Sequence, residues 1–161
     1  MSIDLKDTSA LDCLAKNLDA FLKEHLPLAR AAGVQIDSYD GDSLQVSAPL
    51  ELNINDKLTA FGGSLYNLCV IAAWGMTDLK AKELGFTGDI VVAKGEINYL
   101  RPLRSRLIAS AFAPDEAMIE KAIHSYQTRN KAVFTIAVQI LDEQQQVCVD
   151  FQGKYAILAS S

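Results

Sequence analysis

The sequence predicts an α+β fold in which an antiparallel sheet curls around one long, buried helix. Two observations lead there: a helix-length segment over residues 62–84 whose first half is apolar almost all round, and strand-like segments on both sides of it that are joined in pairs by short connections. A helix that is apolar on nearly every side has to be buried on most of them. A sheet wrapped around the helix provides that burial.

Length and charge favour one domain, which we expect to span residues 1–161. Half of the residues are hydrophobic, 22% are charged, and the formal net charge is −5, which argues against a general nucleic-acid or membrane-surface binder. The N-terminal residues lack the apolar core of a signal peptide. The most apolar run, residues 65–76, is much shorter than the ~20 residues of a membrane span.

The cysteines and histidines give no sign of a metal or cofactor site. Cys13, Cys69 and Cys148 are far apart and odd in number, which predicts reduced thiols in a cytoplasmic protein. Cys69 lies in the apolar helix and is interpreted as a core residue rather than a nucleophile. His25 and His124 fall on predicted helices and are interpreted as surface or packing residues. We therefore expect no metal and no cofactor.

The first element is an N-terminal helix, which we assign to residues 1–30. The apolar pattern itself predicts helix over residues 5–32, broken or kinked by Pro27 and ended by Gly33. The stripe that would face the core recurs at helical spacing. It comprises Leu11, Leu14, Leu18, Phe21, Leu22 and Leu26.

The other elements follow from turn signals and periodicity. Residues 34–39 and 43–48 flank the turn "DGD" and predict a hairpin, followed by a loop over 49–59 and the central helix over 62–84, which Gly85 ends. Further strands are predicted at 89–100, 107–113, 129–141 and 147–158, with a short helix opening at residues 114–116.

The strand over 89–100 is predicted to present a small-residue face to the central helix. With a period of two, this face would carry Val91, Ala93, Gly95, Ile97 and Tyr99. The small Ala93 and Gly95 would let the helix approach closely. The opposite face carries Lys94, Glu96 and Asn98 and is interpreted as solvated or as a subunit interface.

Two local motifs connect this pattern with a known family. The stretch "N-x5-F-G-G", residues 55–63, resembles the N-x-x-G-x-x-H-G-G signature of PaaI-type hotdog thioesterases. The stretch "INYLRPLRSRLIASA", residues 97–111, resembles the strand–Arg-Pro–strand hairpin of the same superfamily. More closely, "LTAFGGSLYNLCVIAAWG" with "IVVAKGEINYLRPL" resembles the thioesterase domain of the YiiD C-terminal family. The resemblance covers residues 30–158 and implies a hotdog fold.

The glycine pair at the start of the central helix has a direct chemical use. The first turn of a helix has N–H groups without intrahelical partners, at the positive end of the dipole. These groups can hold a thioester carbonyl oxygen, and hold it more strongly as an oxyanion. The resemblance implies that the Gly62 N–H is the oxyanion donor, with Gly63 beside it. The residues alone leave open that both glycines only allow tight packing.

The loop before the helix supplies two further candidates. Asn55 matches the asparagine of the family motif, which implies that it orients the attacking water or the thioester; a turn or N-cap residue is the alternative. Asp56 could act as general base, as an aspartate of this loop does in other hotdog thioesterases. The alternative for Asp56 is a capping or solvated carboxylate.

The sequence departs from the PaaI motif at three positions. Phe61 stands where that motif has histidine, Leu58 replaces its first glycine, and Val70 stands where that family's helix carries a catalytic acid. The usual base is therefore missing at its usual place, which also argues against the hotdog dehydratases. Relatives in the YiiD-like family share the phenylalanine, so Phe61 is retained as a candidate substrate-binding residue.

The remaining substrate-binding candidates are polar or aromatic groups near the helix start. Tyr66 would line an acyl pocket or belong to the core. Asn67 needs a hydrogen-bond partner on its apolar helix, either a substrate or a neighbouring strand or subunit. Arg101, Arg104 and Arg106 form a positive cluster in "RPLRSR", suited to coenzyme A phosphates, with a solvated turn as the alternative.

These observations together predict a thioesterase that hydrolyses acyl-CoA or acyl-carrier-protein thioesters. Coenzyme A enters as part of the substrate. One alternative is a non-catalytic acyl-thioester or lipid-binding module. Another is a partner domain of an acetyltransferase, since some family members carry this domain behind an acetyltransferase domain, for which these 161 residues leave no room. The hotdog resemblance also implies a homodimer or higher homo-oligomer with acyl sites at the interface.

Overall fold

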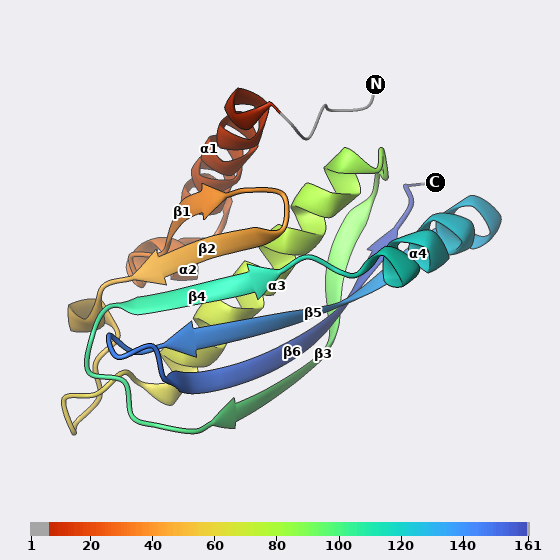
Figure 1. Cartoon of the computed structure of the whole chain (residues 1–161). Helices are drawn as coiled ribbons and strands as arrows, with labels where there is room; N and C mark the ends of the chain where they lie inside the picture. The colour runs from red at the N-terminus through yellow and green to blue at the C-terminus, as the bar shows by residue number, and fades with distance from the viewer. Residues whose placement is uncertain (1–6, 161) are drawn as a thin grey trace.

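The computed structural model describes residues 7–160 (Figure 1). Its helices are α1 (Thr8–His25), α2 (Pro27–Ala31), α3 (Gly62–Glu83) and α4 (Glu116–Arg129), with a 3₁₀ turn at Leu50–Leu52. Its strands are β1 (Gln35–Tyr39), β2 (Ser43–Ala48), β3 (Asp89–Tyr99), β4 (Leu107–Phe112), β5 (Lys131–Leu141) and β6 (Val147–Leu158). All six strands form one sheet in the order β1-β2-β4-β5-β6-β3, and every neighbouring pair is antiparallel.

The sheet curls around α3, which confirms the predicted α+β fold. Figure 1 shows α3 behind the curved sheet, and the helix contacts β2, β3, β4, β5 and β6. More than half of its residues are buried, on several sides of the helix. The apolar sequence of α3 is therefore explained by its central position.

The predicted N-terminal helix is two helices. Asp7 caps the first turn of α1 by accepting a hydrogen bond from the Ser9 amide, and Leu26 adopts an extended conformation that ends the helix before Pro27. The proline then occupies the first turn of α2, where its missing N–H costs nothing. Gly33, with φ of +69°, ends the segment as predicted. The part of the prediction that covers residues 1–6 lies outside the described residues.

A bulge in β3 makes part of the predicted face wrong. Val92 pairs with Tyr155 and Lys94 pairs with Lys154, so Ala93 is an extra residue between them. Beyond the bulge, Gly95, Ile97 and Tyr99 face α3 as predicted. Before it, Ile90 and Val92 line the space beside α3, so Val91 and Ala93 lie on the other face. An extra residue shifts a period-two pattern by one position, and the alternation of residues in β3 does not predict it.

The C-terminal end of α3 is tied to the β1–β2 hairpin by buried polar groups. The side chains of Lys80 and Glu83 are 8% and 7% exposed and form an ion pair of 2.9 Å. The Tyr39 hydroxyl donates to Glu83, and the Lys80 ammonium donates to the Gly41 carbonyl. Burial, followed by the hydrogen bond to Glu83, raises the pKa of the Tyr39 hydroxyl. Each member of this network has a partner within the chain.

Among the described residues, α4 covers one end of the outer face of the sheet, where it packs on β5 (Figure 1). Asp115 caps α4 by accepting a hydrogen bond from the Met118 amide, and Asn130 ends the helix in the left-handed conformation. Elsewhere on this face, Ile108 and Phe112 of β4 remain partly exposed. Within residues 7–160, no helix is long and apolar enough to cross a membrane.

Candidate functional site

The N-terminus of α3 opens without a side-chain cap. Phe61 occupies the N-cap position, and no side chain bonds to the first turn. The Phe61 amide donates to the Asn53 carbonyl at 2.7 Å, and the first intrahelical bond runs from the Leu65 amide to the Phe61 carbonyl at 3.0 Å. The N–H groups of Gly62, Gly63 and Ser64 therefore precede the helical ladder, at the positive end of the helix dipole.

The two glycines of this turn have different surroundings. A Cβ on Gly63 would come within 2.5 Å of Cε1 of Phe61, because the phenylalanine ring lies over this residue. A Cβ on Gly62 would meet the Tyr99 ring at 3.5 Å, which is ordinary contact, and the Tyr99 hydroxyl donates to the Gly62 carbonyl at 2.8 Å. Packing of Phe61 therefore accounts for Gly63. The packing here leaves room for a methyl group at Gly62.

In the helix-entry loop, residues 53–61, the side chain of Asn55 forms hydrogen bonds with other residues of the same loop. Its Oδ1 accepts from the amides of Lys57 at 2.9 Å and Thr59 at 3.1 Å, and its Nδ2 donates to Thr59 Oγ1 at 2.9 Å. These bonds fix the turn that leads to Phe61. The structure therefore gives Asn55 the loop-forming contacts that the sequence left open as an alternative to direct contact with substrate.

Asp56 points into solvent in the isolated chain. Its side chain is 80% exposed, and its carboxylate lies 3.1 Å from the ammonium of Lys57. Nothing within the described chain desolvates this carboxylate or directs it at the first turn of α3. The role of Asp56 as general base stays a prediction, and it requires further contacts that shield the carboxylate from solvent and orient it.

A pocket of about 330 Å³ adjoins the first turns of α3. We call it the entry pocket. It brings together three predicted residues, Phe61, Gly63 and Asn67, with Ser64, which sequence reasoning missed although it lies one helical turn before Asn67. The other lining residues are Leu28, Ala31, Ala32, Leu52 and Asn53.

Two of the polar side chains that line the entry pocket have no hydrogen-bond partner in the described chain. Within residues 7–160, Ser64 and Asn67 form no side-chain hydrogen bond, and no fully buried polar atom is unpaired, so both reach the pocket or solvent. Asn53 differs, because its Nδ2 donates to the carbonyls of Ala32 and Pro49. Ser64 and Asn67 are thus available to a ligand, whereas Asn53 holds the pocket wall in place.

Tyr66 lies on another side of α3, against the sheet. Its hydroxyl contacts the position where a Gly95 Cβ would be, and its ring meets Phe151 edge-on at 5.6 Å. Gly95 thereby provides the close approach that the sequence predicted. Nearby Cys69 is fully buried, and burial raises the pKa of its thiol, so the thiol stays protonated and is unsuited to act as a nucleophile.

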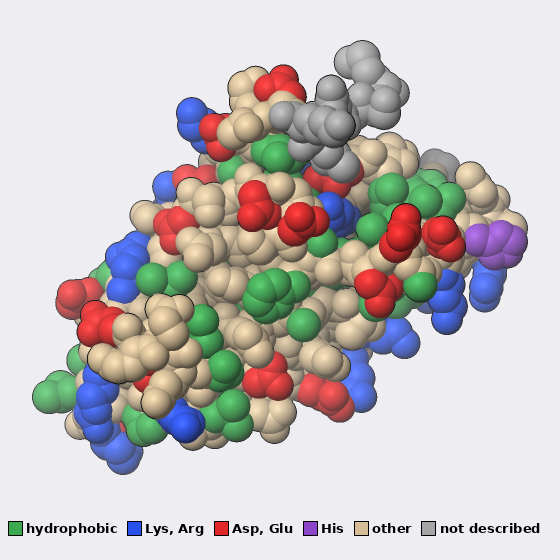
Figure 2. All heavy atoms as spheres, viewed as in Figure 1, with side chains coloured by type: hydrophobic (Ala, Val, Ile, Leu, Met, Phe, Trp, Pro, Cys, Tyr) green, Lys and Arg blue, Asp and Glu red, His purple; other side chains and the backbone are tan. Residues whose placement is uncertain are grey.

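The arginine loop, residues 101–106, runs beside the helix-entry loop. The Leu103 carbonyl accepts a hydrogen bond from the Ala60 amide at 2.8 Å. Arg104 is exposed, and Arg101 donates to the Gln146 side chain at 3.0 Å. Lys and Arg side chains gather at the lower left of Figure 2, where these two loops lie in Figure 1. No ion pair within the described residues engages the three arginines of the loop.

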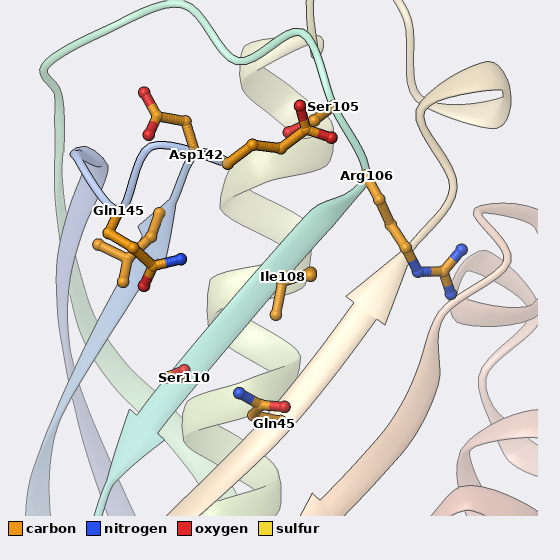
Figure 3. Close-up of a pocket in the computed structure, with 9 residues that line it drawn as sticks. Gln45, Ser105, Arg106, Ile108, Ser110, Asp142 and Gln145 are labelled. Atoms are coloured by element: carbon orange, nitrogen blue, oxygen red, sulfur yellow. The ribbon is translucent and has the colours of Figure 1, made fainter.

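Arg106 turns to the outer face of the sheet instead. Its guanidinium donates to Ser47 Oγ at 3.0 Å, and Figure 3 shows the side chain leading away from β4 toward the neighbouring strand. It borders a polar pocket of about 370 Å³ on that face, shared with Gln45, Ser110 and Asp142 among others. The predicted arginine cluster is therefore divided between two faces, and this outer pocket is separated from α3 by the sheet.

No metal site is evident in the part of the chain that the structure describes. No group of three or more His, Cys, Asp or Glu side chains is placed so that it could hold a metal ion. The candidate site therefore consists of helix N–H groups, the hydroxyl of Ser64, the amide of Asn67, and the positive charge of Arg101 and Arg104.

The wrapped sheet and the open N-terminus of its central helix define a hotdog-fold protein. The E. coli PaaI protein from the phenylacetic acid degradation operon shares this fold, with a TM-score of 0.66 and 20% identity over 94% of this chain and 98% of that one. Two solved structures are more similar. A Chlorobaculum tepidum protein of unknown function has 39% identity and a TM-score of 0.89, covering 93% of this chain and 97% of that one.

The second of these is a "putative thioesterase" from Shewanella oneidensis, with 30% identity and a TM-score of 0.79, covering 91% of this chain and 99% of that one. The family model described as "Putative thioesterase (yiiD_Cterm)" matches residues 15–159. The chain belongs to this thioesterase family, which confirms the resemblance found in the sequence.

Proposed function

We propose that this protein hydrolyses acyl thioesters of coenzyme A or acyl-carrier protein at the N-terminus of α3. The observation that carries the proposal is the uncapped first turn of α3 beside a pocket with unpartnered polar side chains. The thioester carbonyl oxygen would accept hydrogen bonds from the N–H groups of Gly62 and Gly63. These bonds strengthen as water adds and the oxygen becomes negative. Collapse of the intermediate breaks the carbon–sulfur bond and releases the acid and the thiol.

Ser64 and Asn67 are proposed to position the reacting groups. They lie one turn apart on α3, face the entry pocket and have no competing partner in the described chain. Asn55 would act indirectly, by holding the loop that places Phe61 and the first turn. Asp56 remains the proposed base, which requires that a second subunit or the substrate removes it from bulk water.

Arg101 and Arg104 are the proposed phosphate contacts of coenzyme A. They belong to the loop that is bonded to the helix-entry loop through Ala60 and Leu103, and they carry no ion pair in the described chain. Guanidinium groups suit phosphates because they offer several donors in a fixed plane. Arg106 has a weaker claim, since it bonds to Ser47 on the outer face.

A homodimer is part of the proposal. Among the described strands, β3 lies at the edge of the sheet with β6 as its one neighbour, and its Val91 and Val92 are 43% and 51% exposed. A long edge strand with exposed apolar side chains is a liability for an isolated chain, and pairing with a second copy would cover it. We also propose a cytoplasmic protein, in agreement with free thiols at all three cysteines.

A non-catalytic acyl-thioester-binding module is the second candidate. It is favoured by one observation: none of the described residues that line the entry pocket carries a carboxylate or an imidazole. The same geometry would then bind the thioester without activating water. Association with an acetyltransferase is a further proposal and would fit such a binding role.

Hydrolysis of acyl-CoA and acyl-carrier-protein substrates tests the proposal. We expect turnover by the wild type and a loss of at least tenfold in kcat/KM for Asn67→Leu. Asn17→Leu, on the exposed face of α1, is the matched control. Saturable binding without turnover of either substrate class would support the binding module. Neither turnover nor binding would overturn both candidates.

A further inference from the structure

We propose that the acyl chain of the substrate lies in a groove between α1–α2 and α3, and that Trp74 sets a preference for medium-length saturated chains of about 10–12 carbons. This inference rests on the proposed function, because it assumes that the thioester is held at the first turn of α3. The inference adds the location of the acyl chain and its preferred length.

A second pocket carries the argument. It encloses about 310 Å³ and is lined almost entirely by apolar side chains from α1, α3 and the sheet. We call it the apolar pocket. Its principal lining residues are Phe21, Leu26, Val70, Ile71, Trp74 and Val92. The Tyr155 hydroxyl at its wall already donates to the Val70 carbonyl at 2.8 Å, so it places no unmet hydrogen bond in the pocket.

The apolar pocket continues the entry pocket along one face of α3. Asn67 of the entry pocket is followed at helical spacing by Val70 and Ile71, and these by Trp74. On the facing wall, Leu28 of the entry pocket and Leu26 of the apolar pocket flank Pro27. The two pockets therefore follow each other along α3, with α2 opposite the helix at the entry pocket and α1 and the sheet opposite it at the apolar pocket.

The far end of this groove is lined by a pair of stacked aromatic rings. Phe21 and Trp74 stack with their ring centroids 5.7 Å apart and an interplanar angle of 10°. The Trp74 indole donates to the Ile90 carbonyl at 3.3 Å, which fixes its orientation. Next to Trp74 along the chain, Leu18 of α1 and Leu44 of β2 lie within 3.1 Å of the position of a Gly75 Cβ, so the helix is tightly packed against both elements there.

The polarity and the length of the groove match one kind of occupant. Its mouth has N–H groups, Ser64 and Asn67, whereas its far end is apolar, as an acyl thioester requires. Ser64 and Trp74 are ten residues apart, which is about 15 Å along a helix. A single carbon–carbon bond of ~1.5 Å advances an extended chain by about 1.25 Å per carbon. About 12 carbons would therefore reach Trp74.

Trp74 is the only tryptophan of the chain, so its fluorescence reports on the end of the groove. We would titrate the protein with saturated fatty acids and acyl-CoAs of 4 to 16 carbons. The expected result is a change in Trp74 emission for chains of about 10 carbons and longer, and none for 4 carbons. In parallel, Val70→Phe should lower the ratio of kcat/KM for 12-carbon over 4-carbon acyl-CoA at least tenfold. Ile108→Phe, on the outer face of the sheet, is the control.

The outcomes separate this inference from the proposed function. Length-dependent Trp74 emission without hydrolysis supports the groove and refutes the hydrolase. Hydrolysis with unchanged Trp74 emission, and with no effect of Val70→Phe, refutes the groove and supports the hydrolase. If Val70→Phe instead dissociates an oligomer without changing chain-length preference, a second copy occupies the groove and the inference is wrong.

Discussion

The polar groups at the two ends of α3 differ in whether they have hydrogen-bond partners within the chain. At the C-terminal end, Lys80, Glu83 and Tyr39 are buried and bonded to one another. At the N-terminal end, the first turn has no side-chain cap, and Ser64 and Asn67 have no partner within residues 7–160. One helix thus has a closed end that fastens the hairpin and an open end that is free to bind. The candidate site is therefore marked by side chains and N–H groups that have no hydrogen-bond partner in the described chain.

The largest expected effect is a loss of stability at the closed end. Glu83→Leu leaves the Lys80 ammonium buried without its carboxylate, which should lower the free energy of unfolding by about 3–5 kcal/mol. Urea denaturation measures the change. Lys82→Ala removes the more exposed pair with Asp78 and should cost no more than about 1 kcal/mol. Equal losses in both variants would contradict the comparison.

At the open end, Gly63→Ala should harm activity more than stability. The new methyl group would displace the ring of Phe61, which is 55% exposed and has room to move. Alanine has a higher helix propensity than glycine, which offsets the free-energy cost of moving the ring by about 0.5–1 kcal/mol. The value of kcat/KM should nevertheless fall at least tenfold, because the displaced ring lies beside the oxyanion donors. Acyl-CoA hydrolysis and thermal unfolding measured on one preparation test this. A well-folded variant with full activity would argue against a site at this turn.

Alkaline pH should weaken the closed end through Tyr39. Its pKa is raised in the folded state above the ordinary value of about 10, so the unfolded state loses its proton first. The stabilisation is complete below pH 10 and is lost above it, by at most about 1.4 kcal/mol per pH unit from this group. Burial also raises the pKa of Tyr155, which makes the free energy of unfolding fall more steeply with pH. The free energy of unfolding, measured with urea between pH 8 and 11, should therefore fall less steeply with pH for Tyr39→Phe than for wild type. The same dependence on pH in both proteins would refute this role of Tyr39.

The smallest expected effect is on stability at Asn67. Because its amide has no partner in the described chain, Asn67→Leu should change the free energy of unfolding by less than about 1 kcal/mol, in either direction. Asn53→Leu is the informative contrast, since it removes two hydrogen bonds to backbone carbonyls and should cost about 1–3 kcal/mol. A large loss for Asn67→Leu in urea would show that this amide has a structural partner, such as a second subunit.

Several features of the site were readable from the sequence because they depend on local patterns. The glycine pair marks the start of α3, and Asn67 stands out as a polar residue on an apolar helix. The role of Asn55 was not readable to the same extent, because its loop-forming bonds to Lys57 and Thr59 and a direct contact with substrate fit the same spacing. Ser64 was missed because a serine in a first helical turn is common and only the pocket gives it significance.

The sequence by itself determined the order of the helices and strands, the break at Pro27, the burial of α3 and the family. These follow from periodicity, from turn residues and from motifs, which are properties of neighbouring residues. The tertiary structure alone decided that Ala93 forms a bulge, that Lys80 and Glu83 are buried, and that residues of α1 and α2 line the two pockets beside α3. The physical reason is that strand register, burial and pocket shape arise from contacts between segments far apart in the chain, and no local pattern encodes them.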